Sequence, residues 1–136
     1  MIVVLVVLGL IAGIAASRGP ARSRALDVRA AVGDVAAALR GARGRAIAVN
    51  RPVLVVVNGA QNSLSVDGGP PLRLPAGMGL AAATGVEAVP GRQVASIRFA
   101  PDGSSSGGRI VLADGARRVL VGVDWLTGRV SVANAP

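Results

Sequence analysis

The chain has 136 residues, of which 15 are basic (all of them arginine) and 7 are acidic, giving a formal net charge of +8. A chain of this length folds as one compact domain by default. It contains no Cys, His, Lys or Tyr, which excludes a Ser-His-Asp triad, a cysteine nucleophile, a Cys/His zinc site and a Schiff-base lysine. Its hydrophobic content of 51% is too high for a disordered chain.

Residues 1–17 begin with the apolar run MIVVLVVLGLIAGIAA, and the first charge is Arg18. As a helix this run extends about 24 Å, less than the ~30 Å hydrocarbon core of a bilayer. A cleaved secretory signal has a cleavage-like region in 12–16 but lacks the basic residues that should precede it. A buried core helix is disfavoured because large apolar residues cover every face. We therefore expect a transmembrane and filament-assembly helix whose beginning is missing, with these apolar side chains: Met1, Val4, Leu5, Leu8, Leu10, Ile11 and Ile14.

Residues 18–49 carry the pattern of an amphipathic helix that continues the apolar one. Gly19-Pro20 should break or kink the chain between the two. Asn50 ends the helical pattern. The arginines, Arg43 among them, lie largely outside the apolar stripe, and we interpret them as a solvated helix face in preference to a nucleic-acid patch. The stripe recurs at three- and four-residue steps and consists of Ala25, Val28, Val32, Val35, Leu39, Ala42 and Ala46.

Residues 50–136 change to short β-branched segments separated by turn residues, which predicts an antiparallel β domain. Asn58-Gly59 and Asp114-Gly115 are hairpin turn signals. Residues 72–92 are rich in Gly, Pro and Ala, and we interpret them mostly as loop, with a short strand near 72–74. The predicted class is α+β, with a long N-terminal helix packed on the β domain. The other predicted strands are 53–57, 63–66, 94–99, 109–113, 117–124 and 129–133.

Three features of the β domain suggest chemistry but have simpler explanations. The run 103–108 (GSSSGG) looks like a phosphate cradle, yet it lacks a Walker lysine and is followed by a strand. Asp102, Asp114 and Asp124 each lie beside a turn, where Asp is favoured, and their spacing is not that of a calcium loop. We interpret Trp125 as an apolar anchor for one end of the sheet, with an exposed interaction residue as the alternative. We expect no catalytic, cofactor-binding or metal site.

The positive charge raises the question of nucleic-acid binding. The arginines are scattered over the predicted helix and strands, and aromatic residues for base stacking are almost absent. DNA binding is therefore open but not favoured. A membrane-anchored hydrolase that uses Asp and Ser residues is a further alternative, which the residue inventory disfavours.

Two stretches of sequence are more distinctive than the composition. Residues 97–130 read IRFAPDGSSSGGRIVLADGARRVLVGVDWLTGRV, and residues 27–55 read DVRAAVGDVAAALRGARGRAIAVNRPVLV. Together with the apolar start, they resemble the type IV pilin-like proteins, and in particular the minor pseudopilin H family of type II secretion systems (general secretion pathway protein H). The C-terminal motif residues that carry this resemblance are Phe99, Pro101, Asp102, Gly103, Gly107, Gly108, Asp124, Trp125, Leu126, Thr127 and Gly128.

The front of the chain departs from the family pattern. The basic leader and the G-F-T-L-x-E processing motif are absent, and Met1 takes the place of the residue after that Glu. Restoring about five residues would lengthen the apolar helix to about 31 Å, close to the bilayer thickness. The positive-inside rule would otherwise hold the arginines after the apolar run in the cytoplasm. The basic leader would outweigh these arginines in setting the orientation of the helix in the membrane. We hypothesise that the sequence starts at an internal Met, which the reading frame upstream would test.

The resemblance implies a non-enzymatic subunit of the type II secretion pseudopilus, which helps to export folded proteins across the outer membrane. It implies a single-pass protein of the bacterial inner membrane with its C-terminal domain in the periplasm and no cofactor. The implied partners are the other minor pseudopilins, the major pseudopilin and, if the leader exists, the prepilin peptidase that trims and N-methylates the chain. The alternative is a minor pilin of a type IV pilus, of the FimT or FimU kind, with DNA binding as a further option.

Overall fold

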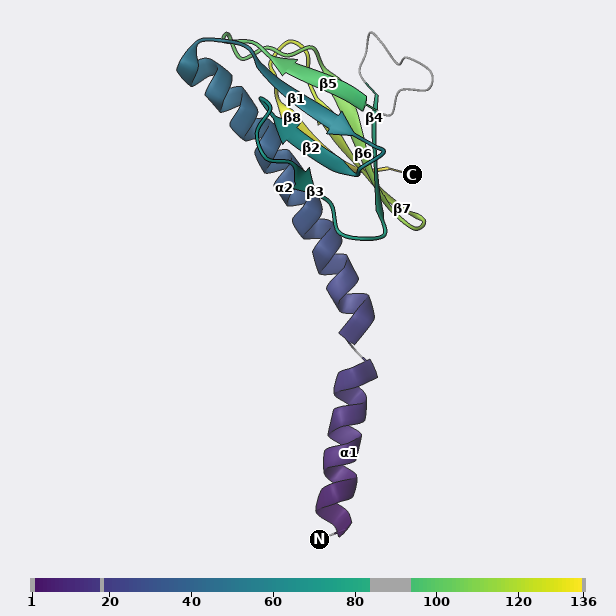
Figure 1. The fold of residues 1–136 in the computed structure, drawn as a ribbon. Coiled ribbons are helices and arrows are strands. Elements are labelled where there is room, and N and C mark those ends of the chain that lie inside the picture. Colours follow the sequence, from purple (N-terminus) through teal and green to yellow (C-terminus); the bar gives the residue numbers. More distant parts are fainter. Residues whose placement is uncertain (1, 18, 84–93, 136) are drawn as a thin grey trace. The chain divides into compact units, whose positions relative to one another are not determined.

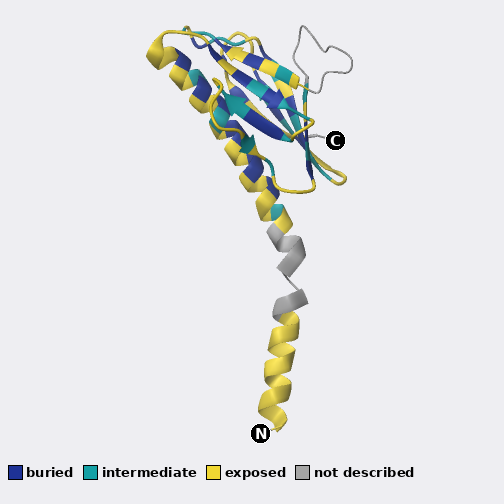
Figure 2. Ribbon diagram, in the orientation of Figure 1, coloured by how far each residue is buried: buried dark blue, intermediate teal, exposed yellow. Residues whose placement is uncertain are grey.

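The computed structural model describes residues 2–17, 19–83 and 94–135. The chain divides into two compact units, Met1–Ala30 and Ala31–Pro136. The first unit contains helix α1 (Ile2–Ser17). Its described side chains, residues 2–14, are all exposed, as the yellow colouring of Figure 2 shows.

The predicted assembly residues lie on this exposed helix, except Met1, which is outside the described residues. The exposed ones are Val4, Leu5, Leu8, Leu10, Ile11 and Ile14. Within the described ranges, no helix combines the length and the apolarity that a membrane crossing requires.

Helix α2 (Gly19–Val49) carries the predicted amphipathic stripe. Pro20 lies in its first turn, where a missing amide leaves no intrahelical bond unmade. Asn50 follows the helix in a left-handed conformation, with φ of 55°, which ends it as predicted. Ala25 is half-buried. The other stripe residues are buried: Val28, Val32, Val35, Leu39, Ala42 and Ala46.

Two antiparallel sheets make up the rest of the described structure (Figure 1). The first has the order β3-β2-β1-β5, and the second has the order β4-β6-β7-β8. The first sheet consists of β1 (Val53–Asn58), β2 (Ser63–Val66), β3 (Leu72–Arg73) and β5 (Val94–Phe99). The second consists of β4 (Met78–Ala83), β6 (Gly108–Asp114), β7 (Arg117–Val123) and β8 (Val130–Ala135).

The predicted α+β class is confirmed, and the predicted strands agree with the structure apart from shifts at their ends. The short strand near 72–74 is β3. The loop prediction for 72–92 is wrong over β4, because MGLAAA has few of the β-branched residues that mark a strand. Its register with β6, from Met78↔Asp114 to Ala83↔Arg109, is set by pairing between distant segments. Residues 84–93 lie outside the described ranges.

The core draws side chains from α2 and from both sheets. Phe99 on β5 and Leu39 on α2 are fully buried. Ile110 and Val121 supply the corresponding positions from the second sheet. Because the apolar stripe of α2 enters this core, Arg43, which directly follows buried Ala42, lies at its edge.

Candidate functional site

The C-terminal motif residues lie in two loops that bond to each other. The first loop joins β5 to β6, and the second joins β7 to β8. The amide of Ser105 donates to the carbonyl of Trp125 (2.9 Å), and its hydroxyl donates to the carbonyl of Asp124 (2.8 Å). Motifs about twenty residues apart in sequence therefore form one junction.

The loop at 124–129 is a turn held by its own carboxylate. The Asp124 carboxylate accepts from the amides of Thr127 (3.0 Å) and Leu126 (2.8 Å). These bonds favour the charged form and lower the pKa of the carboxyl below its ordinary value. The amide of Gly128 donates to the Asp124 carbonyl (2.9 Å), with Gly128 at a positive φ of 67°.

The loop at 100–107 uses its carboxylate in the same way. The Asp102 carboxylate accepts from the hydroxyl of Ser104 (2.6 Å) and from the same residue's amide (2.9 Å), and these bonds lower the pKa of Asp102. The amide of Gly103 donates to the Ala100 carbonyl at 3.0 Å. Both motif carboxylates are thus occupied in shaping turns, which is the role that the sequence predicts for Asp at these positions.

Arg43 on α2 connects both loops to the helix. Its Nε–H donates to the carbonyl of Gly103 (3.0 Å) and to the carbonyl of Thr127 (3.1 Å). A β-carbon on Gly103 would lie 2.9 Å from the guanidinium, and one on Gly128 would lie 2.9 Å from Nε and meet the Gly103 carbonyl oxygen. Because Gly103 and Gly128 have no side chains, there is room at these two positions for the Arg43 guanidinium.

This arrangement corrects the interpretation of Arg43 as part of a solvated helix face. The side chain is half-buried and bonded to two backbone carbonyls. The helical spacing alone could not reveal this, because the acceptors lie 60 and 84 positions away in sequence.

The interpretation of Trp125 as an apolar anchor for one end of the sheet is wrong, because its side chain is exposed; a role of the exposed side chain in an interaction stays a prediction. The Trp125 side chain is 66% exposed, and that of Leu126 is 63% exposed. The hydrogen bonds of the turn fix the backbone so that both side chains leave the domain surface. A β-carbon on Gly107 would lie 3.1 Å from the Trp125 β-carbon, so the loop backbone packs beneath the tryptophan.

The remaining motif residues have structural positions in the same junction. Phe99 is fully buried at the end of β5, and Pro101 is half-buried in the turn that follows. Gly107 is buried, and Gly108 begins β6. In the described part of the chain, no group of three or more His, Cys, Asp or Glu side chains could hold a metal ion.

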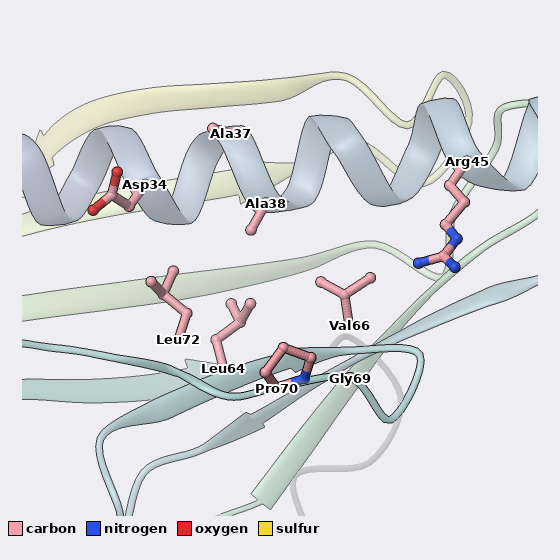
Figure 3. A pocket seen from close by; sticks show the side chains of 9 residues that line it. All are labelled: Asp34, Ala37, Ala38, Arg45, Leu64, Val66, Gly69, Pro70 and Leu72. Carbon is pink, nitrogen blue, oxygen red and sulfur yellow. The ribbon is translucent and has the colours of Figure 1, made fainter.

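A groove of about 520 Å³ lies between α2 and the β2–β3 edge of the first sheet (Figure 3). Its walls are mostly apolar, with Asp34 toward one end and Arg45 toward the other. The other lining residues are Ala37, Ala38, Leu64, Val66, Gly69, Pro70 and Leu72. The ionisable groups of this lining are the Asp34 carboxylate and the Arg45 guanidinium.

The architecture, an amphipathic helix packed on antiparallel sheets after an apolar helix in sequence, defines the chain as a pilin-like protein. It is similar to the crystal structure of the type IV minor pilin FimU of Pseudomonas aeruginosa strain PAO1 in space group P65, with a TM-score of 0.56 and 15% identity over 77% of this chain and 91% of that chain. A second crystal form of FimU, in space group P21, gives a TM-score of 0.58 and 15% identity over 84% and 92% of the two chains. At this level of identity the likeness shows the fold.

The family follows from sequence. The family model of type II transport protein GspH matches residues 31–127. The type II secretion system protein H of Xanthomonas campestris pv. campestris is 34% identical over 131 residues, which cover 96% of this chain and 77% of that protein. The chain belongs to the GspH family, and the resemblance drawn from its C-terminal motifs is confirmed.

Proposed function

We propose that this chain is a minor pseudopilin, a non-enzymatic building block of the type II secretion pseudopilus that helps to export folded proteins across the outer membrane. Its proposed partners are the other minor pseudopilins and the major pseudopilin. Membership of the GspH family supports the proposal.

The observation that carries the structural role is that the polar motif groups form hydrogen bonds with the chain's own backbone and turns. The carboxylates of Asp102 and Asp124 accept hydrogen bonds from their own turns, and the Arg43 Nε–H is shared between two backbone carbonyls. Groups that act on a substrate must instead reach a reacting atom. The motif side chains therefore serve to hold a surface in shape.

Helix α1 supports a place in a membrane or a filament. Its described side chains are apolar and exposed on every face, a surface that water disfavours. A bilayer or a bundle of like helices would cover it. We propose that residues 1–17 are the membrane and assembly helix of a single-pass inner-membrane protein, 18–49 its amphipathic continuation, and 50–136 a periplasmic β domain. Processing by the prepilin peptidase belongs to the same proposal.

The test is deletion of the gene in its source bacterium, with assays of both protein secretion and surface pili. We expect secreted enzymes to accumulate in the periplasm and pili to stay normal. Complementation by the wild-type gene and by the volume-conserving Leu8→Met should restore secretion, whereas Leu8→Arg, which places a charge among apolar groups, should not. Normal secretion with loss of pili would overturn the proposal in favour of the minor-pilin alternative.

A further inference from the structure

Strand β8 forms an unprotected edge of the second sheet. It pairs with β7 on one side and is the last strand in the order β4-β6-β7-β8. Its register with β7 runs without a bulge from Val123↔Val130 to Arg118↔Ala135. The strand reads VSVANA and contains no charged residue and no proline. Natural edge strands are usually short, bulged, charged or covered, because their free N–H and C=O groups pair readily with another chain.

The other three sheet edges of the described structure are short, bonded or packed. Strand β3 has only two residues. On β5, the Arg98 amide donates to the Ser106 hydroxyl (3.0 Å), and the Ser106 amide donates to the Arg98 carbonyl (2.9 Å), so the following loop takes up part of that edge. The backbone of β4 comes close to β1 and β5. Among the described edges, β8 therefore offers the longest run of free backbone groups.

The apolar layer of the second sheet ends at Val132 without cover. Residues 131–134 are exposed on both faces of the strand, so neither a helix nor a loop of the described ranges covers them. Val132 lies opposite Val121 in the register. Val121 is fully buried, whereas Val132 is 46% exposed. An added strand with an apolar residue beside Val132 would continue the layer and bury that side chain.

The charges at the two ends of β8 are both positive. Arg129 directly precedes the strand, and Arg118 lies on β7 beside Ala135. Both arginine side chains are exposed. Positions 129 and 135 are about 20 Å apart along an extended strand, so an incoming strand with acidic residues six positions apart would meet both charges. A second copy of β8 would instead bring arginines toward arginines, in a chain of net charge +8, which disfavours pairing between copies.

We propose that β8 is a docking edge that takes an extended segment of another protein as a fifth strand of the second sheet. The segment has an apolar residue opposite Val132 and acidic residues at its ends, within reach of Arg129 and Arg118. Backbone hydrogen bonds supply the affinity, and these side chains supply the selectivity. The inference is drawn from the sheet alone and does not depend on the role in secretion, so its test and the deletion test can fail separately.

The probe is a synthetic heptapeptide, EVTVTVE, with blocked ends and a fluorescent label. It reads the same in both directions, so it fits a parallel or an antiparallel fifth strand. Binding to the full-length chain in nonionic detergent is followed by fluorescence anisotropy. The control peptide KVTVTVK has the same alternation and the opposite charge, and we expect it to bind at least about tenfold more weakly. Arg118→Glu combined with Arg129→Glu should reverse the preference between the two peptides.

A matched pair of variants locates the site. Val132→Lys places a charge at the edge of β8, which should weaken EVTVTVE binding about tenfold despite the added positive charge. Val94→Lys, at a similarly exposed position (47%) on β5, adds the same charge and should leave binding unchanged. Amides of residues 130–135 should also gain protection from hydrogen exchange when the probe binds.

Methylation of the probe backbone separates strand addition from simple charge attraction. Amides of alternate residues point to opposite edges of a strand, so methyl groups on two valines or on two threonines block one edge, whereas methyl groups on one valine and its neighbouring threonine block both. We expect at least one of the first two probes to bind within about twofold of the parent, and the third to bind at least about tenfold more weakly.

Four results would overturn the proposal: no binding of EVTVTVE at millimolar concentration, equal binding of KVTVTVK, parent-like binding of the probe methylated on both edges, or equal weakening by Val94→Lys and Val132→Lys while both variants keep the wild-type circular dichroism. Protection of residues 130–135 that rises with protein concentration in the absence of the probe would assign the edge to a second copy and would also overturn it.

Discussion

Arg43 gives the sharpest test of how the domain is held together, through the substitution Arg43→Ala. One Nε–H is shared between the carbonyls of Gly103 and Thr127, so the two contacts count as roughly one hydrogen bond from a charged donor, worth about 2 kcal/mol. Removal of the arginine stem, which packs against Gly128, adds to this loss. We expect the free energy of unfolding to fall by about 2–3 kcal/mol.

Thermal unfolding of the full chain in nonionic detergent, followed by near-UV circular dichroism, measures the effect. For a domain of this size, a loss of this magnitude lowers Tm by about 8 °C or more. Arg40→Ala is the matched control, because Arg40 is exposed on the same helix and its side chain forms no hydrogen bond or ion pair within the described structure. Its effect should stay within about 0.5 kcal/mol. Arg43→Lys should not rescue stability, since the position of Nε is a methylene in lysine.

Equal stability of the Arg43→Ala and Arg40→Ala proteins would refute the reasoning. If Arg43→Lys is as stable as the wild type, the stabilisation does not come from the Nε hydrogen bonds. The positive charge alone would then explain it.

Three further predictions concern the turns and the core. Gly128→Ala should lower the free energy of unfolding by more than 2 kcal/mol in thermal melts, whereas Gly68→Ala, which has a similar φ of 70° but open space around its β-carbon, should lower it by only about 1–2 kcal/mol. Leu39→Ala, at a fully buried position, should lower it by about 2–5 kcal/mol, against less than about 1 kcal/mol for the exposed Leu54→Ala. Hydrogen bonds lower the pKa of Asp124 below 3.8 in the folded chain. The stabilisation that the Asp124 carboxylate gives to the folded state should therefore be complete above pH 3.8 and be lost as the pH falls through the lowered pKa. Asp124→Asn should make Tm less dependent on pH in this acidic range.

Local pattern was sufficient to predict most of the fold. The three- and four-residue spacing of Val28 to Ala46 predicted the buried face of α2, and β-branched runs predicted strands such as β1 and β7. Strand β4 was missed because its Gly and Ala residues carry no strand signal, and only pairing with β6 orders them.

The junction around Arg43 was only partly predictable. The sequence marks the C-terminal run 97–130 as distinctive and predicts that its Asp residues lie beside turns. Arg43 bonds both loops because the tertiary fold brings them close to the helix. The spacing of residues along the helix carries no information about such distances. The exposure of Trp125 likewise depends on turn geometry, because an isolated tryptophan in a sequence is predicted to be buried by its apolarity.

The sequence separation of the Arg43 contacts has a consequence for the order in which the domain folds. Its bonds to Gly103 and Thr127 join positions 60 and 84 residues apart, and β8, which completes the second sheet, begins only at Val130. Contacts of such long range form late and slowly, because a large loop must close before they contribute. During synthesis the apolar stripe of α2 is complete long before the strands that cover it. The domain can therefore close only when nearly the whole chain has been made.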